Sequence, residues 1–203
     1  MVQKTNYKQL FDGQIKLIKE QSKKPTLLLH ACCAPCSSYV LEYLHDVFDI
    51  TLFFYNPNIS PESEYVYRAQ ELERLISELG FSDEVKLIVP SYSTGAFDTI
   101  SKGKESEPER GIRCTDCYRI RLEKTFEYAV QNKFDYYSTT LSISPHKDAQ
   151  RLNEIGSSLA ENSATKWLYS DFKKNNGYIR SIELSEKFNL YRQNYCGCKY
   201  SQR

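Results

Sequence analysis

The sequence predicts an α/β fold in which a parallel sheet is covered by helices on both faces. Short apolar runs of strand length alternate with longer segments of helical periodicity, and Pro or Gly separates most of them. Parallel strands need helical crossovers, so this alternation indicates the fold class. The 203 residues, 40% of them hydrophobic, are enough for one core. We therefore expect a single domain over residues 1–203.

The strands are short and apolar, and most are bounded by Pro or by polar residues. They are expected at 26–30, 51–55, 85–89, 135–140 and 166–170. Pro25 separates the first strand from the helix before it, and Pro90 follows the third strand. Ligands of parallel sheets bind beyond the carboxyl ends of the strands, so the segments after these runs are candidates for a site.

Helical periodicity fills the intervals between the strands. Helices are expected at 6–22, from Ser37 onward, and at 61–79, 116–132 and 147–161. Pro61 suits the first position of the third helix and Gly80 its C-terminal cap. Residues 91–113 are rich in Gly and charge, which is consistent with a mobile loop over a site or a plain surface insertion. The chain is expected to end in a helical, basic tail over 172–203 that carries Cys196 and Cys198.

Charge is distributed unevenly along the chain. Residues 1–24 carry six Lys against two acidic residues, and residues 172–203 carry seven Lys and Arg against two Glu. The middle is acidic, so the net charge is only +1. Basic ends can contact a polyanion such as RNA, or they can be solvated surface lysines. The start of the chain has no secretory pattern and no apolar run reaches membrane length, so a cytoplasmic location without membrane contact is expected.

Seven cysteines fall into three tight groups. Cys32, Cys33 and Cys36 lie in H-A-C-C-A-P-C, Cys114 and Cys117 form C-T-D-C, and Cys196 and Cys198 form C-G-C. In a reducing compartment, clustered cysteines indicate metal or redox chemistry more often than structural disulfides. The first group follows the first strand, and the loop over 91–117 that carries the second group follows the third strand. Two groups therefore converge at one edge of the sheet and offer five thiolates to a metal centre.

The remaining cysteines have more than one interpretation. Cys36 is expected at a helix N-terminus, which favours its thiolate, so it can be a metal ligand or a reactive thiol of a thioredoxin-like C-A-P-C. A disulfide between Cys196 and Cys198 would close a small, strained and easily reduced ring. This favours a redox relay, although two further metal ligands remain an alternative. His146, which follows S-P at the expected edge, is a candidate for substrate contact, and His30 is either a core residue or a partner of the site.

Together, H-A-C-C-A-P-C, N-P-N-I-S-P-E-S-E-Y with Arg68, R-C-T-D-C-Y-R and Y-C-G-C closely resemble the cobalamin-independent epoxyqueuosine reductases of the QueH family. Matches at 138–147 and in D-F-K-K-N-N-G-Y extend the resemblance over most of the chain. It implies reduction of epoxyqueuosine to queuosine in tRNA. It also implies a Rossmann-like sheet of the PP-loop and HUP type. The S-G-G-x-D-S loop of the PP-loop ATP pyrophosphatases is absent, which argues against an ATP-dependent tRNA sulfur transferase. A zinc-binding nucleic-acid module is the other alternative.

The resemblance also assigns roles to residues. It implies a [4Fe–4S] cluster on Cys32, Cys33, Cys114 and Cys117, with an additional iron beside it. Cys36 and Asp116 are candidate ligands of that iron, since iron accepts carboxylates. Cys196 and Cys198 would be the catalytic, redox-active pair, supplied by an unidentified electron donor. The candidates for contact with substrate or tRNA are Tyr65, Arg68, Arg113, Arg119, Asp171 and Arg192.

Overall fold

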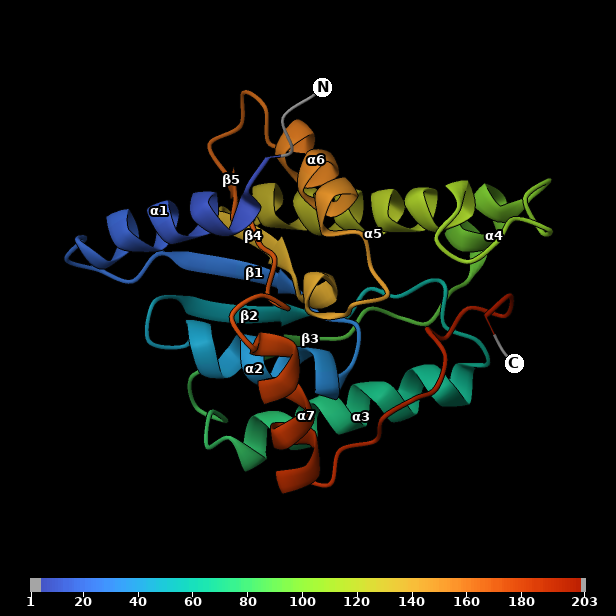
Figure 1. Cartoon of the computed structure of the whole chain (residues 1–203), viewed down its shortest axis with the longest axis horizontal. Coiled ribbons are helices and arrows are strands. Elements are labelled where there is room, and N and C mark those ends of the chain that lie inside the picture. The colour runs from blue at the N-terminus through green and yellow to red at the C-terminus, as the bar shows by residue number, and fades with distance from the viewer. Residues whose placement is uncertain (1–4, 202–203) are drawn as a thin grey trace.

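Five parallel strands form one sheet in the order β3-β2-β1-β4-β5 in the computed structural model, which describes residues 5–201 (Figure 1). The strands are β1 (Thr26–His30), β2 (Asp49–Phe53), β3 (Lys86–Ile88), β4 (Tyr136–Thr139) and β5 (Lys166–Trp167). The predicted parallel α/β fold is therefore confirmed. The register places His30, the last residue of β1, opposite Phe53 of β2 and Thr139 of β4. These three central strands thus end level with one another.

Helices cover both faces of the sheet. They are α1 (Tyr7–Lys19), α2 (Ala34–Leu44), α3 (Glu62–Glu78), α4 (Gly95–Ser101), α5 (Ile112–Gln131), α6 (Ala149–Leu159) and α7 (Gly177–Lys187), with a 3-10 turn, η1 (Thr140–Ile143). In Figure 1, α5 and α6 lie above the sheet, whereas α2, α3 and α7 lie below it. Among the described residues, no helix is both long enough and apolar enough to cross a membrane.

Strand β1 shows why the sheet needs both layers. Leu27 and Leu29 are fully buried in the hydrophobic cluster that α2 and α3 share, while Leu28 is fully buried in the cluster on the α5 and α6 side. Successive side chains of a strand point to opposite faces, so a strand covered on both faces is apolar throughout. Tyr137 of β4 packs on the same face of the sheet as Leu28, under α5 and α6, and its ring contacts Trp167 edge to face.

Two helix starts differ from the expectation. Helix α2 begins at Ala34 rather than Ser37, because Pro35 has the backbone angle that suits a first turn. Helix α5 begins at Ile112, directly after Gly111, so Cys114 and Cys117 lie in the first turns of a helix and not in an irregular loop. The segment over 91–113 itself contains the short helix α4.

The strand order creates a switch point between β1 and β4. The chain leaves β1 toward β2 on one side, and it returns to β4 on the other side. Binding sites of open α/β sheets lie in the crevice at such a point. The described segment after α7 runs along α3 toward the carboxyl ends of the strands (Figure 1). Lys4 and Arg203, which contribute to the basic ends, lie outside the described residues.

Candidate metal centre

The first thiol group lies in the crevice at the switch point. Cys32 follows β1, Cys33 is the N-cap of α2 and Cys36 lies in its first turn. The three sulfur atoms are within 4.8 Å of one another, and the Cys32 and Cys33 sulfurs are 3.7 Å apart. The Cys32 sulfur is also 3.8 Å from Thr140 Oγ1, just beyond β4, so it spans the crevice. Thiolates this close suit a soft metal ion or an iron–sulfur cluster.

These three thiols differ in their pKa. Hydrogen bonds from Cys33 and Cys36 hold the pKa of Cys32 well below its usual value. The same hydrogen bonds raise the pKa of Cys33 to about 12 and raise that of Cys36 well above its usual value. Among the three, Cys32 is thus the thiol that most readily loses its proton. A metal ion would release the remaining protons, because thiolates are the ligands.

The second and third thiol groups pack against each other. Cys117 of α5 and Cys198 of the tail are buried in one cluster with Phe97, and Cys196 packs against its edge. Burial raises the pKa of the Cys117 thiol. Cys114, one turn before Cys117, accepts a hydrogen bond from the backbone amide of Arg110 over 3.3 Å.

Two adjoining cavities are lined by the seven cysteines. The larger, about 330 Å³, is lined by Cys32, Cys33, Cys36 and Cys196. The smaller, about 20 Å³, is lined by Cys114, Cys117, Cys196 and Cys198. Cys196 is the cysteine that lines both, and Arg121 and Lys147 also line both. The fold therefore brings all three groups together at one edge of the sheet, and all seven cysteines are free thiols.

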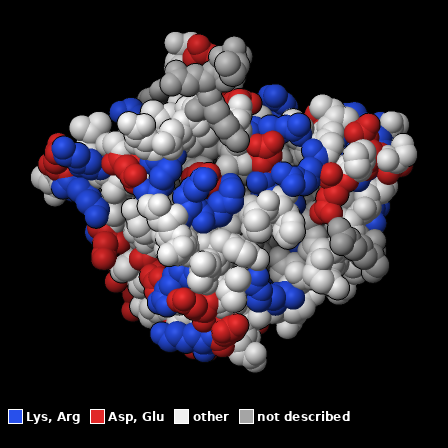
Figure 2. All heavy atoms as spheres, in the orientation of Figure 1, with Lys and Arg blue, Asp and Glu red and all other residues white. Residues whose placement is uncertain are grey.

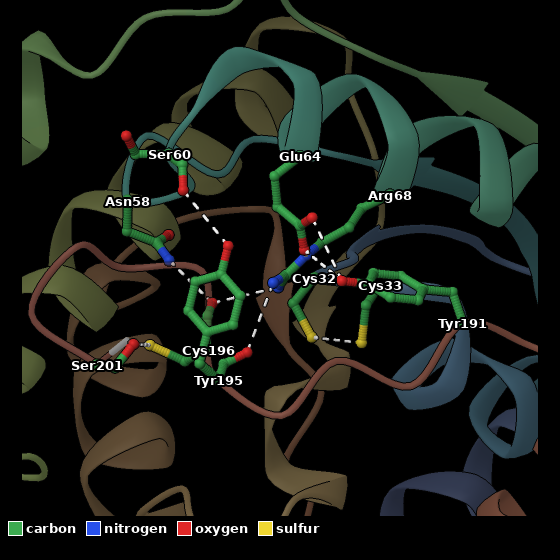
Figure 3. Close-up of polar contacts among 10 residues, drawn as sticks. All are labelled: Cys32, Cys33, Asn58, Ser60, Glu64, Arg68, Tyr191, Tyr195, Cys196 and Ser201. Carbon is green, nitrogen blue, oxygen red and sulfur yellow. Dashed lines mark hydrogen bonds and ion pairs between the residues drawn. The ribbon is translucent and has the colours of Figure 1, made fainter. Parts of the chain in front are cut away.

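The C-G-C segment is held in place by α3 and the loop before it (Figure 3). Arg68 directs Nη1 to the carbonyl oxygen of Cys196 over 3.3 Å, and its Nε donates to Glu64 over 2.7 Å. The amide of Ser60 donates to the carbonyl oxygen of Gly197 over 3.0 Å. Gly197 has a φ of +98°, which favours glycine. Arg68 is only 2% exposed, so this predicted substrate contact also anchors the tail.

The other predicted contact residues divide into three sets. His146 and Arg192 line the larger cavity. Tyr65 and Arg113 are buried and bond to backbone: the Tyr65 hydroxyl is 2.8 Å from the carbonyl oxygen of Pro90, and Arg113 Nη1 is 2.6 Å from that of Lys104.

Three further predicted residues line neither cavity, which is also true of Tyr65. Arg119 is exposed in a groove between α5 and α6. Asp171 forms an ion pair with Lys173. Asp116, the candidate ligand of the additional iron, forms an ion pair with Lys104 over 2.5 Å. These three roles stay predictions.

Arg121 and Lys147 are site residues that the sequence analysis did not name. Arg121 follows Cys114 and Cys117 by seven and four positions, so all three lie on one face of α5. That helical spacing is the signal that would have identified it.

Burial, together with the charge of Arg121, lowers the pKa of His30 to about 3, so this imidazole is neutral. His30 is thus a buried neighbour of the site.

Comparison with known proteins gives one consistent result. A family model described as "Epoxyqueuosine reductase QueH" matches residues 27–203. The chain is 43% identical over 203 residues to a Streptococcus pyogenes serotype M1 protein named epoxyqueuosine reductase QueH, covering 99% of this chain and 80% of that protein. The chain is 41% identical to the protein of the same name from Staphylococcus epidermidis, and the match covers 98% of this chain and 85% of that protein. The chain is 35% identical over 179 residues to the Thermotoga maritima protein of that name, and the match covers 87% of this chain and 90% of that protein.

Proposed function

Since the chain belongs to the epoxyqueuosine reductase QueH family and converts epoxyqueuosine to queuosine in tRNA, we propose that it does so with an iron–sulfur cluster held by its converging cysteines. The observation that carries the proposal is the pair of adjoining cavities at the switch point, lined by seven free cysteines. No other group of metal-ligating side chains as tight as Cys32, Cys33 and Cys36 occurs within residues 5–201.

The thiols fit a [4Fe–4S] cluster by their chemistry and their number. We assign Cys32 and Cys33 from the larger cavity and Cys114 and Cys117 from the smaller one as its four ligands. When bound, the metal centre would supply one-electron chemistry and a Lewis-acidic iron for the epoxide oxygen. Cys36 lies within the first thiol group, which supports it as a ligand of an additional iron. Asp116 could join it only after leaving Lys104.

Cys196 and Cys198 are proposed as the redox-active pair. Removing the epoxide oxygen breaks two C–O bonds, forms a C=C bond and releases water, which consumes two electrons and two protons. Oxidation of two thiols to a disulfide forms one S–S bond and releases two electrons and two protons, so the two half-reactions balance. An external electron donor must then reduce the disulfide. Cys196, which lines both cavities, connects the larger cavity with the second thiol group.

The larger cavity is proposed to receive the modified nucleotide. Its volume of about 330 Å³ suits one nucleobase with its substituent, and its wall includes His146, Tyr178 and Arg192. An enzyme that acts on a base in a structured RNA has to take that base out of its stack. Lysine and arginine side chains gather on the face shown in Figure 2, interspersed with acidic groups. They provide phosphate contacts for the rest of the tRNA.

The decisive experiment uses anaerobically purified, cluster-loaded protein. The protein is incubated with epoxyqueuosine-containing tRNA and a chemical reductant, without ATP, and nucleosides are quantified after digestion. Formation of queuosine supports the proposal. A requirement for ATP would favour a sulfur transferase, and a colourless protein that contains only zinc would favour a nucleic-acid module. Either result would contradict the proposed cofactor chemistry.

A further inference from the structure

Arg121 is a buried arginine whose hydrogen bonds go to neutral side chains. It is 3% exposed and lies in the third turn of α5. Its Nη2 donates to Asn56 Oδ1 over 2.6 Å, and its Nε is 3.3 Å from Nε2 of His30. Neither a carboxamide nor an imidazole supplies a negative charge here. Among residues 5–201, no carboxylate forms an ion pair with Arg121. A guanidinium stays charged in proteins, so its burial without a counter-charge is unfavourable.

The guanidinium is positioned from both sides of the crevice. Asn56, which accepts from Arg121, donates through Nδ2 to the carbonyl oxygen of Ala31, the residue before Cys32. The helix that carries Arg121 also carries Cys114 and Cys117 on the same face. Arg121 lines both the larger and the smaller cavity. Arg121, like Lys147, is thus a cation that faces both pairs of proposed cluster ligands.

We propose that Arg121 is an internal counter-charge of the proposed cluster and a positioning residue for its ligands. The inference rests on the proposed cofactor. Four thiolates contribute four negative charges, which exceed the positive charge of the iron–sulfide core, and reduction adds one more. A buried cation next to the ligands therefore stabilises the loaded site and favours its reduced state. Without the cluster, the guanidinium keeps only its neutral hydrogen-bond partners and the nearby Cys32 sulfur.

If Arg121 has this role, its removal has an effect that the removal of a purely structural arginine would not have. In Arg121→Met, the loss of hydrogen bonds to Asn56 and His30 affects the loaded and the cluster-free protein alike. Loss of the counter-charge affects the loaded protein more than the cluster-free protein, because four thiolate ligands face the cation there. The variant should therefore lower the unfolding midpoint more in the loaded state than in the cluster-free state. It should also lower the reduction potential of the cluster, whereas Arg121→Lys, which keeps the charge, should stay close to wild type.

Arg113 offers a matched control on the same helix. It is also 3% exposed, but it lines only the smaller cavity, and its Nη1 is bonded to the carbonyl oxygens of Lys104 and Glu105. Arg113→Met removes the same charge from a site whose carbonyl dipoles already compensate it. We expect a smaller shift of the reduction potential in this variant than in Arg121→Met.

The experiment compares wild type with Arg121→Met, Arg121→Gln, Arg121→Lys and Arg113→Met, each purified anaerobically with and without the cluster. Reduction potentials are read by redox titration with electron paramagnetic resonance, and iron release to a chelator is timed. We expect release to be about tenfold faster in Arg121→Met. If Arg121→Met does not fold, Arg121→Gln is compared with Arg121→Lys in the same way. Equal potentials and release rates in all loaded variants, or an equal shift in Arg113→Met, would overturn the inference. A wild-type protein that takes up no cluster would instead refute the proposed cofactor.

Discussion

Arg68 and Cys196 are joined by a hydrogen bond of 3.3 Å from the guanidinium to the cysteine carbonyl oxygen, across 128 positions of sequence (Figure 3). The same arginine is held by Glu64, one turn earlier on α3, and packs over the ring of Tyr195. The bond fixes the backbone of the C-G-C segment rather than its thiols. Helix α3 thereby determines where the third group of cysteines lies.

Replacing Arg68 should therefore destabilise the protein and displace the redox pair. In Arg68→Met, the Glu64 carboxylate, whose side chain is only 14% exposed, loses its ion-pair partner and keeps only the hydrogen bond from the Tyr191 hydroxyl. Breaking a buried ion pair in this way should lower the free energy of unfolding by about 3 kcal/mol. Urea unfolding of the cluster-free protein measures the loss. Lys124→Met is the control, because it removes an exposed pair with Glu127 that contributes less than about 1 kcal/mol. Equal losses in the two variants would contradict the role of Arg68.

A side chain at Gly197 should destabilise the folded protein more than one at Gly80. Its φ is +98°, and an added Cβ would lie 2.8 Å from Ile59 Cγ1 and 3.2 Å from Arg68 Nη1. Gly80 has a similar φ of +76° but open space around it. We expect Gly80→Ala to lower the free energy of unfolding by about 1 kcal/mol from backbone strain alone. Gly197→Ala should add a steric penalty of about 2 kcal/mol and reduce turnover. Chemical denaturation of both variants compares the two positions, and similar losses would show that the crowding is absent.

The sequence indicates which residues form strands, but it does not indicate the order of the strands. Apolar runs and Pro signals are local, so β1 and β4 could be located one by one. Their side-by-side placement depends on long-range packing of Leu28 and Tyr137 under α5 and α6. Two cysteine groups could be brought together from the sequence, because both follow strands of the predicted sheet. The third could not, since its position depends on contacts such as Arg68 with Cys196.

Residue type alone also does not reveal the partner of a polar side chain. Arg113 and Tyr65 are predicted from the sequence as ligand contacts, and the structure adds that each is hydrogen-bonded to carbonyl oxygens of nearby loops. Backbone groups left unpaired by irregular segments need such donors when they are buried. Arg121 shows the opposite case, because its helical spacing from Cys114 and Cys117 could have been read from the sequence.

Serine substitutions should separate the cysteines into two classes. In Cys32→Ser, Cys33→Ser, Cys114→Ser and Cys117→Ser, iron and sulfide per chain should fall, because a thiolate ligand is lost. In Cys196→Ser and Cys198→Ser, iron should stay near the wild-type content, while turnover falls by roughly a hundredfold or more. Iron and sulfide analysis beside the queuosine assay makes the distinction. Loss of iron from Cys198→Ser would assign the C-G-C segment to metal binding instead.

The ion pair between Glu42 of α2 and Arg180 of α7 should make stability depend slightly on acidity. The hydrogen bond from Arg180 holds the pKa of Glu42 below its usual value. A lowered pKa in the folded state contributes stability above the unfolded pKa, about 4.3, and this contribution disappears as the pH falls through the folded pKa. Both side chains are more than a third exposed, so we expect less than about 1 kcal/mol. Urea unfolding of wild type and Glu42→Gln at neutral and acidic pH tests this: the gap should close at low pH, and a widening gap would contradict it.

Binding of tRNA should weaken steeply with salt, and Arg192 should contribute to that dependence. Arg192 is exposed, lines the larger cavity and forms no ion pair with a carboxylate within residues 5–201. Arg180, in the same basic tail, is already paired with Glu42 and Glu183. Each phosphate contact adds roughly 0.7 to 0.9 to the slope of log affinity against log salt.

We therefore expect Arg192→Gln to reduce the slope by about one and Arg180→Gln to leave it nearly unchanged. Fluorescence anisotropy with labelled tRNA between low and moderate salt gives both slopes. A flat response of the wild-type protein would contradict phosphate binding by this surface. Equal slopes for the two variants would mean that tRNA does not contact the mouth of the cavity, because the unpaired arginine there would then contribute no more than the paired one.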